Sequence, residues 1–321
     1  MIRHLRPTDT AALLPFRHAA GPAQAFTVAG ALQPSLRGFP ATGYIALALS
    51  LRAWRQCWVD ADDAGIHGVA RVGARNSPQV WEVRDLVSVE AEGQRCASLL
   101  GEIVSAAASQ QVMKVFLRVE EDSWVASAAR RAGYEPGCSE TLYLRAHGPR
   151  TGSGSGTTGS RGEVADHPPA VDGVRPRKGQ DEAGLFRLYC AAAPVQVRAE
   201  GGMTANDWWA SLERVWRRPH EAVQERDGQV TAWLRYGPVQ GWLYFSILAR
   251  PAAVDDLPGL VLLAAAQSDG RPMASLVASY DTAQAAVLER LGFTPERRFQ
   301  VMTQSMVARV REPKGVVVAA S

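Results

Sequence analysis

The sequence contains two copies of one pattern, and this internal repeat limits the folds open to the chain more than any other feature. Near the start of each copy, an apolar–Arg pair precedes an Asp and two helix-forming residues, and the two sets are offset by 172 residues. A repeated pattern of this kind predicts one supersecondary unit used twice. The matched residues are Ile2-Arg3, Asp9, Ala11 and Leu13 in the first copy, and Val174-Arg175, Asp181, Ala183 and Leu185 in the second.

The ends of the two copies match more closely, at an offset of 159 residues. The pattern there predicts a strand, a capping acid, a short helix, a helix-stopping Gly and a last strand. The change of offset makes the second copy about thirteen residues shorter in its middle. The matched pairs are Leu117 and Leu276, Asp122 and Asp281, Ser123 and Thr282, Ala126 and Ala285, Arg131 and Arg290, Gly133-Tyr134 and Gly292-Phe293, and Pro136 and Pro295.

The composition changes sharply between the copies. Residues 147–173 are rich in Gly, Pro, Ser and Thr and include the run Thr151-Gly-Ser-Gly-Ser-Gly-Thr-Thr-Gly-Ser160. Such a segment cannot bury enough apolar area to offset its ordering entropy, so it predicts a flexible linker. We therefore expect an N-terminal domain over 1–146, a linker over 147–173, a C-terminal domain over 174–312 and a tail over 313–321.

Hydrophobic spacing and turn residues predict the elements of each copy. In the first copy, strands are expected over 56–60, 66–75, 79–89, 112–119 and 134–145, with helices over 95–110 and 122–132. In the second copy, strands are expected over 222–225, 230–236, 241–248, 273–279 and 299–310, with helices over 257–268 and 281–291. This order predicts an α/β fold of two tandem domains, each a mixed, mostly antiparallel sheet flanked by helices.

The closing helix and its Gly-aromatic pair are the most specific part of the pattern. They read Asp122-Ser-Trp-Val-Ala-Ser-Ala-Ala-Arg-Arg-Ala-Gly-Tyr134 and Asp281-Thr-Ala-Gln-Ala-Ala-Val-Leu-Glu-Arg-Leu-Gly-Phe293. Together with the order of strands and helices, they make each half resemble a domain of the Gcn5-related N-acetyltransferase (GNAT) superfamily. The resemblance covers nearly the whole chain outside the linker and implies a tandem GNAT protein.

This resemblance implies a place for acetyl-CoA or another acyl-CoA as cosubstrate. In such proteins one strand diverges from its neighbour, the pantetheine arm lies in the gap, and the next helix presents backbone amides to the pyrophosphate. We expect the acyl-CoA to bind in the N-terminal copy. The residues expected to contact it are Val87, Val89, Gln94, Arg95, Cys96, Ala97 and Ser98.

The phosphate loop of the superfamily is altered in both copies. It usually reads Arg or Gln, two residues, Gly, one residue, then Gly or Ala, because Gly lets backbone approach phosphate. The first copy has Glu90-Ala-Glu-Gly-Gln-Arg-Cys-Ala-Ser98, which keeps small residues and an Arg that can meet phosphate. An ordinary helix start without a ligand is the alternative. The second copy has no Gly-rich match and places Asp255-Asp256 near the expected anion site.

The usual proton donor of the superfamily is absent. A Tyr four residues before the Gly of the Gly-aromatic pair commonly protonates the leaving thiolate, but Ala129 and Leu288 occupy the matching positions. The remaining catalytic candidates are Glu82 and Asp85, on the strand before the expected gap, where a partly buried carboxylate can deprotonate an ammonium. They are three residues apart, so only one of them can face the gap. An ordinary strand acid paired with an arginine is the alternative.

Three further groups have both a structural and a functional interpretation. Trp209, Leu212 and Trp216 lie at helical spacing, which is typical of a core; they can also form an aromatic wall for an acyl acceptor. Cys96 would be a reactive thiol if the helix N-terminus lowers its pKa. Tyr244 and Ser246 are the polar residues of the second copy's strand over 241–248, which we expect to be structural.

The composition excludes several classes of partner. With 35 Lys plus Arg against 32 Asp plus Glu, the net charge of +3 gives no electrostatic argument for nucleic acid. The four Cys and six His lack metal-ligand spacing, so we expect reduced thiols and no metal. The N-terminal residues lack an apolar signal core and no apolar stretch approaches membrane-spanning length, so we expect a cytoplasmic protein without a membrane partner.

These observations predict an acyl-CoA-dependent N-acyltransferase that transfers an acetyl group to an amine on a small molecule or peptide. The altered loops and the missing Tyr favour an alternative, a catalytically degenerate GNAT-fold protein that binds an acyl-CoA, a metabolite or a protein partner. Acyl or aminoacyl transfer to a non-amine acceptor is a third interpretation. Association of two copies of the chain as a homodimer also stays open.

Overall fold

The computed structural model of the chain describes residues 1–19, 22–33, 56–89, 93–146 and 172–306. Its N-terminal half consists of a short strand, two helices, three antiparallel strands, and then alternating helices and strands. The elements are β1 (Ile2–His4), the 3-10 turn η1 (Pro7–Asp9), α1 (Thr10–Ala19), α2 (Val28–Ala31), β2 (Cys57–Asp62), β3 (Gly65–Ala74), β4 (Val80–Ser88), α5 (Gln94–Ser109), β5 (Lys114–Glu120), α6 (Trp124–Arg131) and β6 (Glu135–Arg145).

The C-terminal half repeats this order, with two short helices after its first long one. Its elements are β7 (Val174–Pro176), η2 (Gly179–Asp181), α7 (Glu182–Ala192), α8 (Val195–Gly201), α9 (Ala205–Ser211), β8 (His220–Arg226), β9 (Gln229–Val239), β10 (Trp242–Ala249), η3 (Pro251–Asp256), α10 (Leu257–Ala266), β11 (Met273–Ala278), α11 (Thr282–Arg290) and β12 (Thr294–Ser305).

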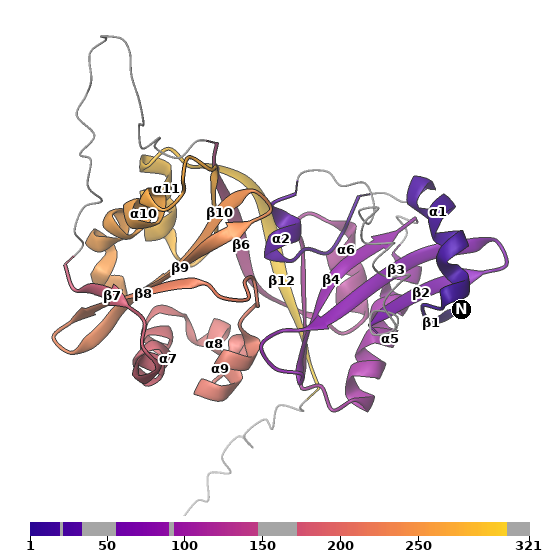
Figure 1. Cartoon of the computed structure of the whole chain (residues 1–321). Coiled ribbons are helices and arrows are strands. Elements are labelled where there is room, and N and C mark those ends of the chain that lie inside the picture. Colours follow the sequence, from indigo (N-terminus) through magenta and orange to yellow (C-terminus); the bar gives the residue numbers. More distant parts are fainter. Residues whose placement is uncertain (20–21, 34–55, 90–92, 147–171, 307–321) are drawn as a thin grey trace, which may run out of the picture.

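The strands of both halves form one 12-stranded sheet, in the order β1-β2-β3-β4-β5-β12-β6-β11-β10-β9-β8-β7. The two halves therefore exchange their last strands: β12 lies between β5 and β6, and β6 lies between β12 and β11 (Figure 1). Neighbouring strands are antiparallel except for β4 with β5 and β10 with β11. The prediction of a mixed, mostly antiparallel sheet flanked by helices is confirmed, and the exchange joins the two halves into a single sheet.

Matching interactions at the start of each half reproduce the repeat seen in the sequence. Arg3 Nη1 donates to the Asp9 carboxylate at 2.6 Å, and the backbone N–H of Arg6 donates to it at 2.7 Å. The same pair of bonds holds Asp181, from Arg175 at 2.7 Å and from the backbone N–H three residues before it at 2.7 Å. Each buried carboxylate thus ties a first strand to the turn that starts the next helix.

The predicted helix-stopping glycines are confirmed in both halves. Gly133 and Gly292 follow α6 and α11 with φ angles of +90° and +81°, a left-handed conformation that favours Gly. The next residue, Tyr134 or Phe293, donates its N–H to the carbonyl five residues before it, at 3.0 Å in both halves. The same turn therefore leads from each helix into the last strand.

Most predicted elements agree with the structure within a few residues, with two notable differences. Ser123 rather than Asp122 caps α6, because its hydroxyl accepts the backbone N–H two residues further on, at 3.2 Å. Asp281 caps α11 as predicted. The last strand begins at Thr294 rather than at 299, since the earlier residues already pair with β6. The predicted linker and tail lie almost entirely outside the described residues, so the domain limits stay a prediction.

Helices cover both faces of the sheet. On one face, α5 and α6 pack on the strands of the N-terminal half, and α10 and α11 pack on those of the C-terminal half. On the opposite face, α1 packs on the strands of the N-terminal half, α2 packs on the central strands β12, β6, β11 and β10, and α7 to α9 pack on the C-terminal half. Because side chains alternate along a strand, each strand contributes residues to both layers.

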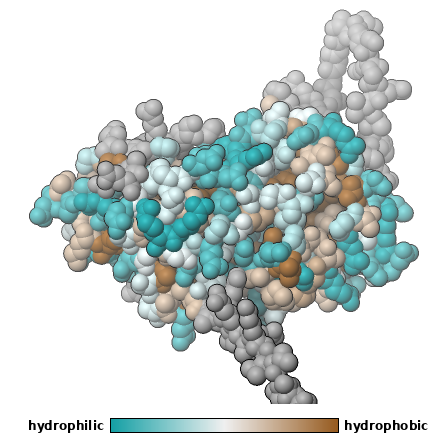
Figure 2. Space-filling model, turned by 180° about the vertical axis from the view of Figure 1, so that it is seen from behind, coloured by the Kyte–Doolittle hydropathy of each residue, from teal (hydrophilic) through white to brown (hydrophobic). Residues whose placement is uncertain are grey.

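The surface carries few large apolar side chains. On the face shown in Figure 2, hydrophobic residues lie scattered among hydrophilic ones. Within the described ranges, the exposed large hydrophobic residues are Met1, Val89, Met113, Val195 and Met203. No helix in the described part of the chain is long and apolar enough to cross a membrane.

Candidate functional site

The parallel strands β4 and β5 of the N-terminal half diverge at their carboxyl ends. They are paired up to Val83 and Leu117 and then separate. Residues 24–26, which form a bend, bridge the two strands. The first of these residues donates its backbone N–H to the Leu86 carbonyl on β4 at 2.8 Å, and the last donates to the Arg118 carbonyl on β5 at 3.0 Å.

The inserted residues are also packed on both sides. Ala25 is 2% exposed and joins the core beneath α5 and α6. Phe26 is 6% exposed; its ring lies 5.3 Å from that of Phe299, and the Arg297 guanidinium lies 4.5 Å above it. Arg118 Nη1 donates to the Phe26 carbonyl at 3.2 Å. The N-terminal gap is therefore filled by the chain itself.

The matching strands β10 and β11 of the C-terminal half diverge earlier. They pair at only two positions, the second being Tyr244 with Ala274. Among the described residues, no backbone segment bridges the remaining length of the two strands. The Gln284 side chain of α11 is buried and lines the cavity beside this gap. The described backbone thus leaves the C-terminal gap without an inserted segment.

A cavity of about 290 Å³ lies beside this gap, between the sheet and the helices α8 and α9. We call it the central cavity, because both halves contribute to its walls. Its volume is at the small end of ligand-binding pockets, which are about 300–1,000 Å³. Its charged and polar lining residues are Arg75, Arg118, Cys138, Glu140, Tyr189, Glu200, Ser211, Glu213, Arg235, Tyr244, Ser246, Tyr280, Asp281 and Gln284.

Buried ion pairs form one wall of the central cavity. Arg75 Nη2 donates to Glu82 at 2.9 Å, Arg118 Nε donates to Glu140 at 2.8 Å, and Arg118 Nη1 lies 2.9 Å from Glu213. Burial, with repulsion from Glu213, raises the pKa of Glu82. Burial opposes the charge on Glu213 as well, but Arg118 and Arg75 hold its pKa below the usual value. These matched charges join the two halves, because Glu213 comes from the C-terminal half.

The wall formed by β10 and β11 carries groups suited to proton transfer. Burial raises the pKa of Tyr244 and of Tyr280, so both hydroxyl groups stay protonated. Burial also raises the pKa of Asp281, although the hydrogen bond from the backbone N–H of Gln284 acts in the opposite direction. A carboxylate with a raised pKa accepts a proton more readily, so this wall holds both a proton acceptor and proton donors.

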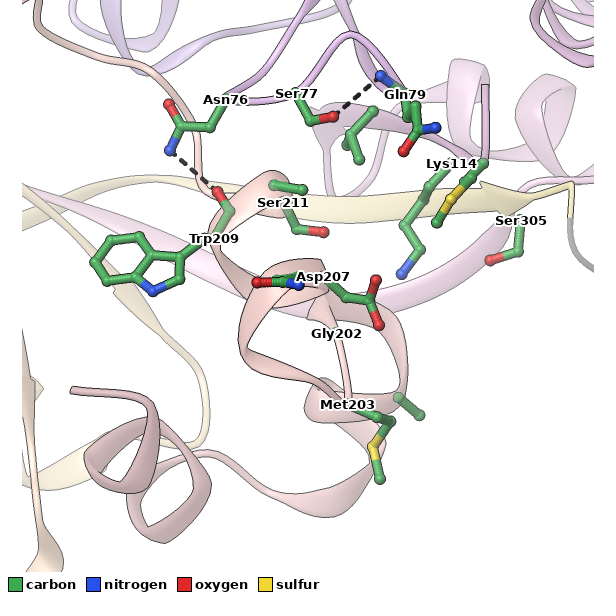
Figure 3. Close-up of a pocket in the computed structure, with 15 residues that line it drawn as sticks. Asn76, Ser77, Gln79, Lys114, Gly202, Met203, Asp207, Trp209, Ser211 and Ser305 are labelled. Carbon is green, nitrogen blue, oxygen red and sulfur yellow. Dashed lines mark hydrogen bonds between the residues drawn. The ribbon is translucent and has the colours of Figure 1, made fainter. Parts of the chain in front are cut away.

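A second pocket, of about 650 Å³, lies on the surface between the β3–β4 turn and the helices α8 and α9 (Figure 3). Asn76 Nδ2 donates to the Trp209 carbonyl at 3.1 Å at one side of it. Lys114 extends into this pocket in Figure 3, and its ammonium donates to the Glu200 carbonyl. These two bonds hold α8 and α9, the helices beside the central cavity, against the N-terminal half.

Comparisons with known proteins bear on the fold. No protein-family model and no curated protein matches the sequence. Among solved structures, the chain is similar to a GCN5-related N-acetyltransferase from Sphaerobacter thermophilus, with a TM-score of 0.50 and 14% identity over 95% of each chain. It is also similar to a Pyrococcus horikoshii protein described as a candidate acetyltransferase, with a TM-score of 0.51 and 10% identity over 95% of this chain and 89% of that one. The chain has the GNAT fold.

A tandem GNAT protein from the clavulanic acid biosynthesis pathway is a further similar structure. It has a TM-score of 0.49 and 15% identity, over 95% of this chain and 98% of that one. The resemblance predicted from the closing helix and the Gly-aromatic pair is therefore confirmed at the level of the GNAT fold.

The two acids predicted for catalysis lie on β4 of this GNAT-fold chain and are both engaged in ion pairs. Glu82 is 4% exposed and belongs to the paired part of the strand, where Arg75 holds it. Asp85 lies beside the divergence, but its carboxylate is held by Arg71 of β3. The alternative interpretation, a strand acid paired with an arginine, describes the contacts of both residues.

The residues predicted to bind the carrier do not share one surface. Val87 is buried in the layer beneath α1, whereas Val89 is 42% exposed. Gln94 and Ser98 are exposed on the first turns of α5. Residues 90–92 of the expected phosphate loop lie outside the described residues.

The other predicted contacts at the start of α5 are engaged with protein. Cys96 and Ala97 are buried in the core beneath α5 and α6. Burial raises the pKa of the Cys96 thiol to about 12, so the hypothesis of a reactive thiolate is wrong. Arg95 donates to Asp62 at 3.0 Å and to Asp60 at 3.3 Å, so its guanidinium already faces two carboxylates.

The positions of the usual GNAT tyrosine hold core residues. Ala129 and Leu288 are both fully buried, so neither can reach a leaving group. The sequence interpretation missed the functional potential of Tyr280, although this residue directly precedes Asp281 of the repeated motif. Tyr244 and Ser246 were expected to be structural. Both line the central cavity, because residues two apart on β10 point to the same face of the sheet.

Proposed function

We propose that the protein is an acyl-CoA-dependent N-acyltransferase whose thioester lies in the C-terminal gap, between β10 and β11. The support is the contrast between the two gaps of one GNAT-fold sheet. Residues 24–26 fill the N-terminal gap, whereas the C-terminal gap opens on the central cavity. The sequence placed acyl-CoA in the N-terminal half, and we revise that expectation. The pantetheine arm cannot pass between β4 and β5 unless residues 24–26 move out.

In this proposal the central cavity takes the acceptor amine. The amine nitrogen attacks the thioester carbonyl carbon, the carbon–sulfur bond breaks, and CoA leaves as a thiolate. Asp281 accepts the proton released by the amine, because burial raises its pKa. The Tyr280 hydroxyl donates a proton to the thiolate, and a proton passed on from Asp281 through solvent restores it.

Calorimetric titration with acetyl-CoA tests where the carrier binds. Ala278 of β11 lines the central cavity, so Ala278→Leu places three more carbon atoms beside the gap and lowers the affinity at least tenfold. The matched control is Arg95→Ala, which removes the cation expected at the N-terminal phosphate site and leaves the affinity unchanged. Circular dichroism and thermal unfolding verify that both variants keep the fold.

The outcomes separate the two placements. If Arg95→Ala loses affinity for acetyl-CoA and Ala278→Leu keeps it, acetyl-CoA binds in the N-terminal half. A wild-type chain that binds neither acetyl-CoA nor CoA ends the acyltransferase proposal. Release of free thiol with a panel of amines then shows turnover, and Asp281→Asn lowers its rate by about 10²–10⁴-fold if this residue is the base.

One observation favours a second function, ligand binding without acyl transfer. The start of α10, where a pyrophosphate would approach, carries Asp255 and Asp256, and only Asp256 has an ion pair among the described residues, with Arg226 at 2.6 Å. Uncompensated negative charge opposes a pyrophosphate. Ligand binding in the cavity with no thiol release across the amine panel selects this function.

A further inference from the structure

One arginine of the central cavity has no ion-pair partner among the described residues. Arg235 lies on β9 and shares a face with Trp233, because the two residues are two apart on one strand. Within the described part of the chain, its guanidinium donates no hydrogen bond and forms no ion pair. It lies 4.6 Å from the centre of a Trp233 ring and 5.9 Å from that of Trp216, so aromatic rings hold it in place.

The other two arginines of the cavity differ in this respect. Arg75 is paired with Glu82, and Arg118 is paired with Glu140 and lies against Glu213. The two carboxylates that act on Arg235 are paired with other arginines: Glu221, opposite it on β8, with Arg177, and Glu213 with Arg118. Arg235 is therefore the arginine of the cavity lining that forms no ion pair with a described residue.

Arg235 is partly buried, so its guanidinium has lost part of its hydration without gaining an ion pair among the described residues. Burial lowers the pKa of Arg235, but a guanidinium keeps its proton, so the desolvation free energy is not relieved. A ligand that brings a negative charge into the cavity relieves it. The unmatched charge is therefore a feature that an anionic ligand explains.

Other unmatched donors line the same cavity. The indole N–H of Trp233 and the hydroxyl of Tyr189 are buried and have no hydrogen-bond partner in the described structure. Buried donors are nearly always paired, so these two are unusual features of residues that line the cavity. Beside them, the Trp208 ring stacks on Tyr189 at 4.9 Å and forms an apolar wall.

We infer that the central cavity binds a small organic carboxylate, with its carboxylate group on Arg235 and its apolar body along the wall of Trp208 and Trp233. A planar carboxylate matches the paired N–H groups of a guanidinium. A singly charged group is favoured over a phosphate dianion, because four carboxylates, those of Glu140, Glu200, Glu213 and Asp281, also line the cavity. As a statement about the acceptor, this inference rests on the proposed acyl transfer: the acceptor amine would carry a carboxylate. Binding of the carboxylate itself does not require acyl-CoA.

Calorimetry and thermal unfolding of the full chain with phenylacetate test the inference. Phenylacetate binds and raises the thermal midpoint, whereas the uncharged isostere phenylacetamide and inorganic phosphate bind at least tenfold more weakly. Arg235→Gln weakens phenylacetate binding at least tenfold. The same variant, without ligand, unfolds at the wild-type temperature or higher, because it removes a partly buried charge that has no ion pair among the described residues. Arg271→Gln, at an exposed arginine of the same half, binds as the wild type.

Four results overturn the inference: no binding of phenylacetate, equal binding of phenylacetamide, tighter binding of phosphate, or unchanged binding in Arg235→Gln. A lower unfolding temperature of the ligand-free variant assigns Arg235 a structural role and overturns it too. Acetyl-CoA is titrated separately into the same proteins. If acetyl-CoA does not bind the wild type, the acyltransferase proposal is wrong, whereas the result with phenylacetate is unaffected.

Discussion

Replacing Phe26 by Ala tests whether residues 24–26 hold the N-terminal gap closed. The ring is 6% exposed, packs 5.3 Å from Phe299, and is covered by Arg297 at 4.5 Å. A Phe-to-Ala change in a packed core lowers the free energy of unfolding by about 3–5 kcal/mol. We expect about 3 kcal/mol, the lower end of this range, because Arg297 is itself partly exposed and can move into the space.

Urea unfolding followed by tryptophan fluorescence measures this difference, and the thermal midpoint falls by about 5–10 °C. The control is Met203→Ala, whose side chain is 57% exposed and whose effect stays within about 0.5 kcal/mol. A Phe26→Ala variant within about 1 kcal/mol of the wild type would refute the packing argument. It would mean that the inserted residues contribute little and that the N-terminal gap is available to a ligand.

Three further predictions concern the exchanged strands, a buried thiol and an ion pair. Cutting the chain at a protease site placed between Ser160 and Arg161 leaves both halves in one particle in size-exclusion chromatography, because β12 is bonded to β5 and β6; separately eluting fragments contradict this. With its pKa raised by burial to about 12, Cys96 reacts with iodoacetamide at pH 8 slower than a free cysteine by a factor on the order of 10³, as mass spectrometry can map; rapid labelling contradicts the burial. Arg175 holds the pKa of Asp181 at about 2, so this pair stabilises the fold fully above about pH 4 and is lost as the pH falls towards 2. Asp181→Asn therefore lowers the free energy of unfolding at pH 7 by about 1–2 kcal/mol and flattens the acid part of the stability curve; an unchanged slope is the contrary result.

The local elements could be predicted because their signals are short-range. Gly133 and Gly292 are needed where the backbone leaves a helix in a left-handed conformation, and Asp281 sits where a helix needs a side-chain cap. The sequence also shows directly that Ala129 and Leu288 replace the usual tyrosine, and both residues lie in the core. Such features depend on neighbours within one or two turns of the chain.

The sequence by itself determined the repeated α/β unit, its helix ends and the fold to which they belong, because periodicity and turn residues act between neighbouring positions. Only the tertiary structure decided that β12 enters the first half, that Phe26 fills one gap, and that the other opens on Arg235. Each of these depends on contacts between residues far apart in the chain, and a strand's sequence does not specify which partner strand it joins. The interpretation of Arg95 as a phosphate ligand did not anticipate its ion pairs for the same reason, since Asp60 and Asp62 lie on β2, 35 and 33 residues away.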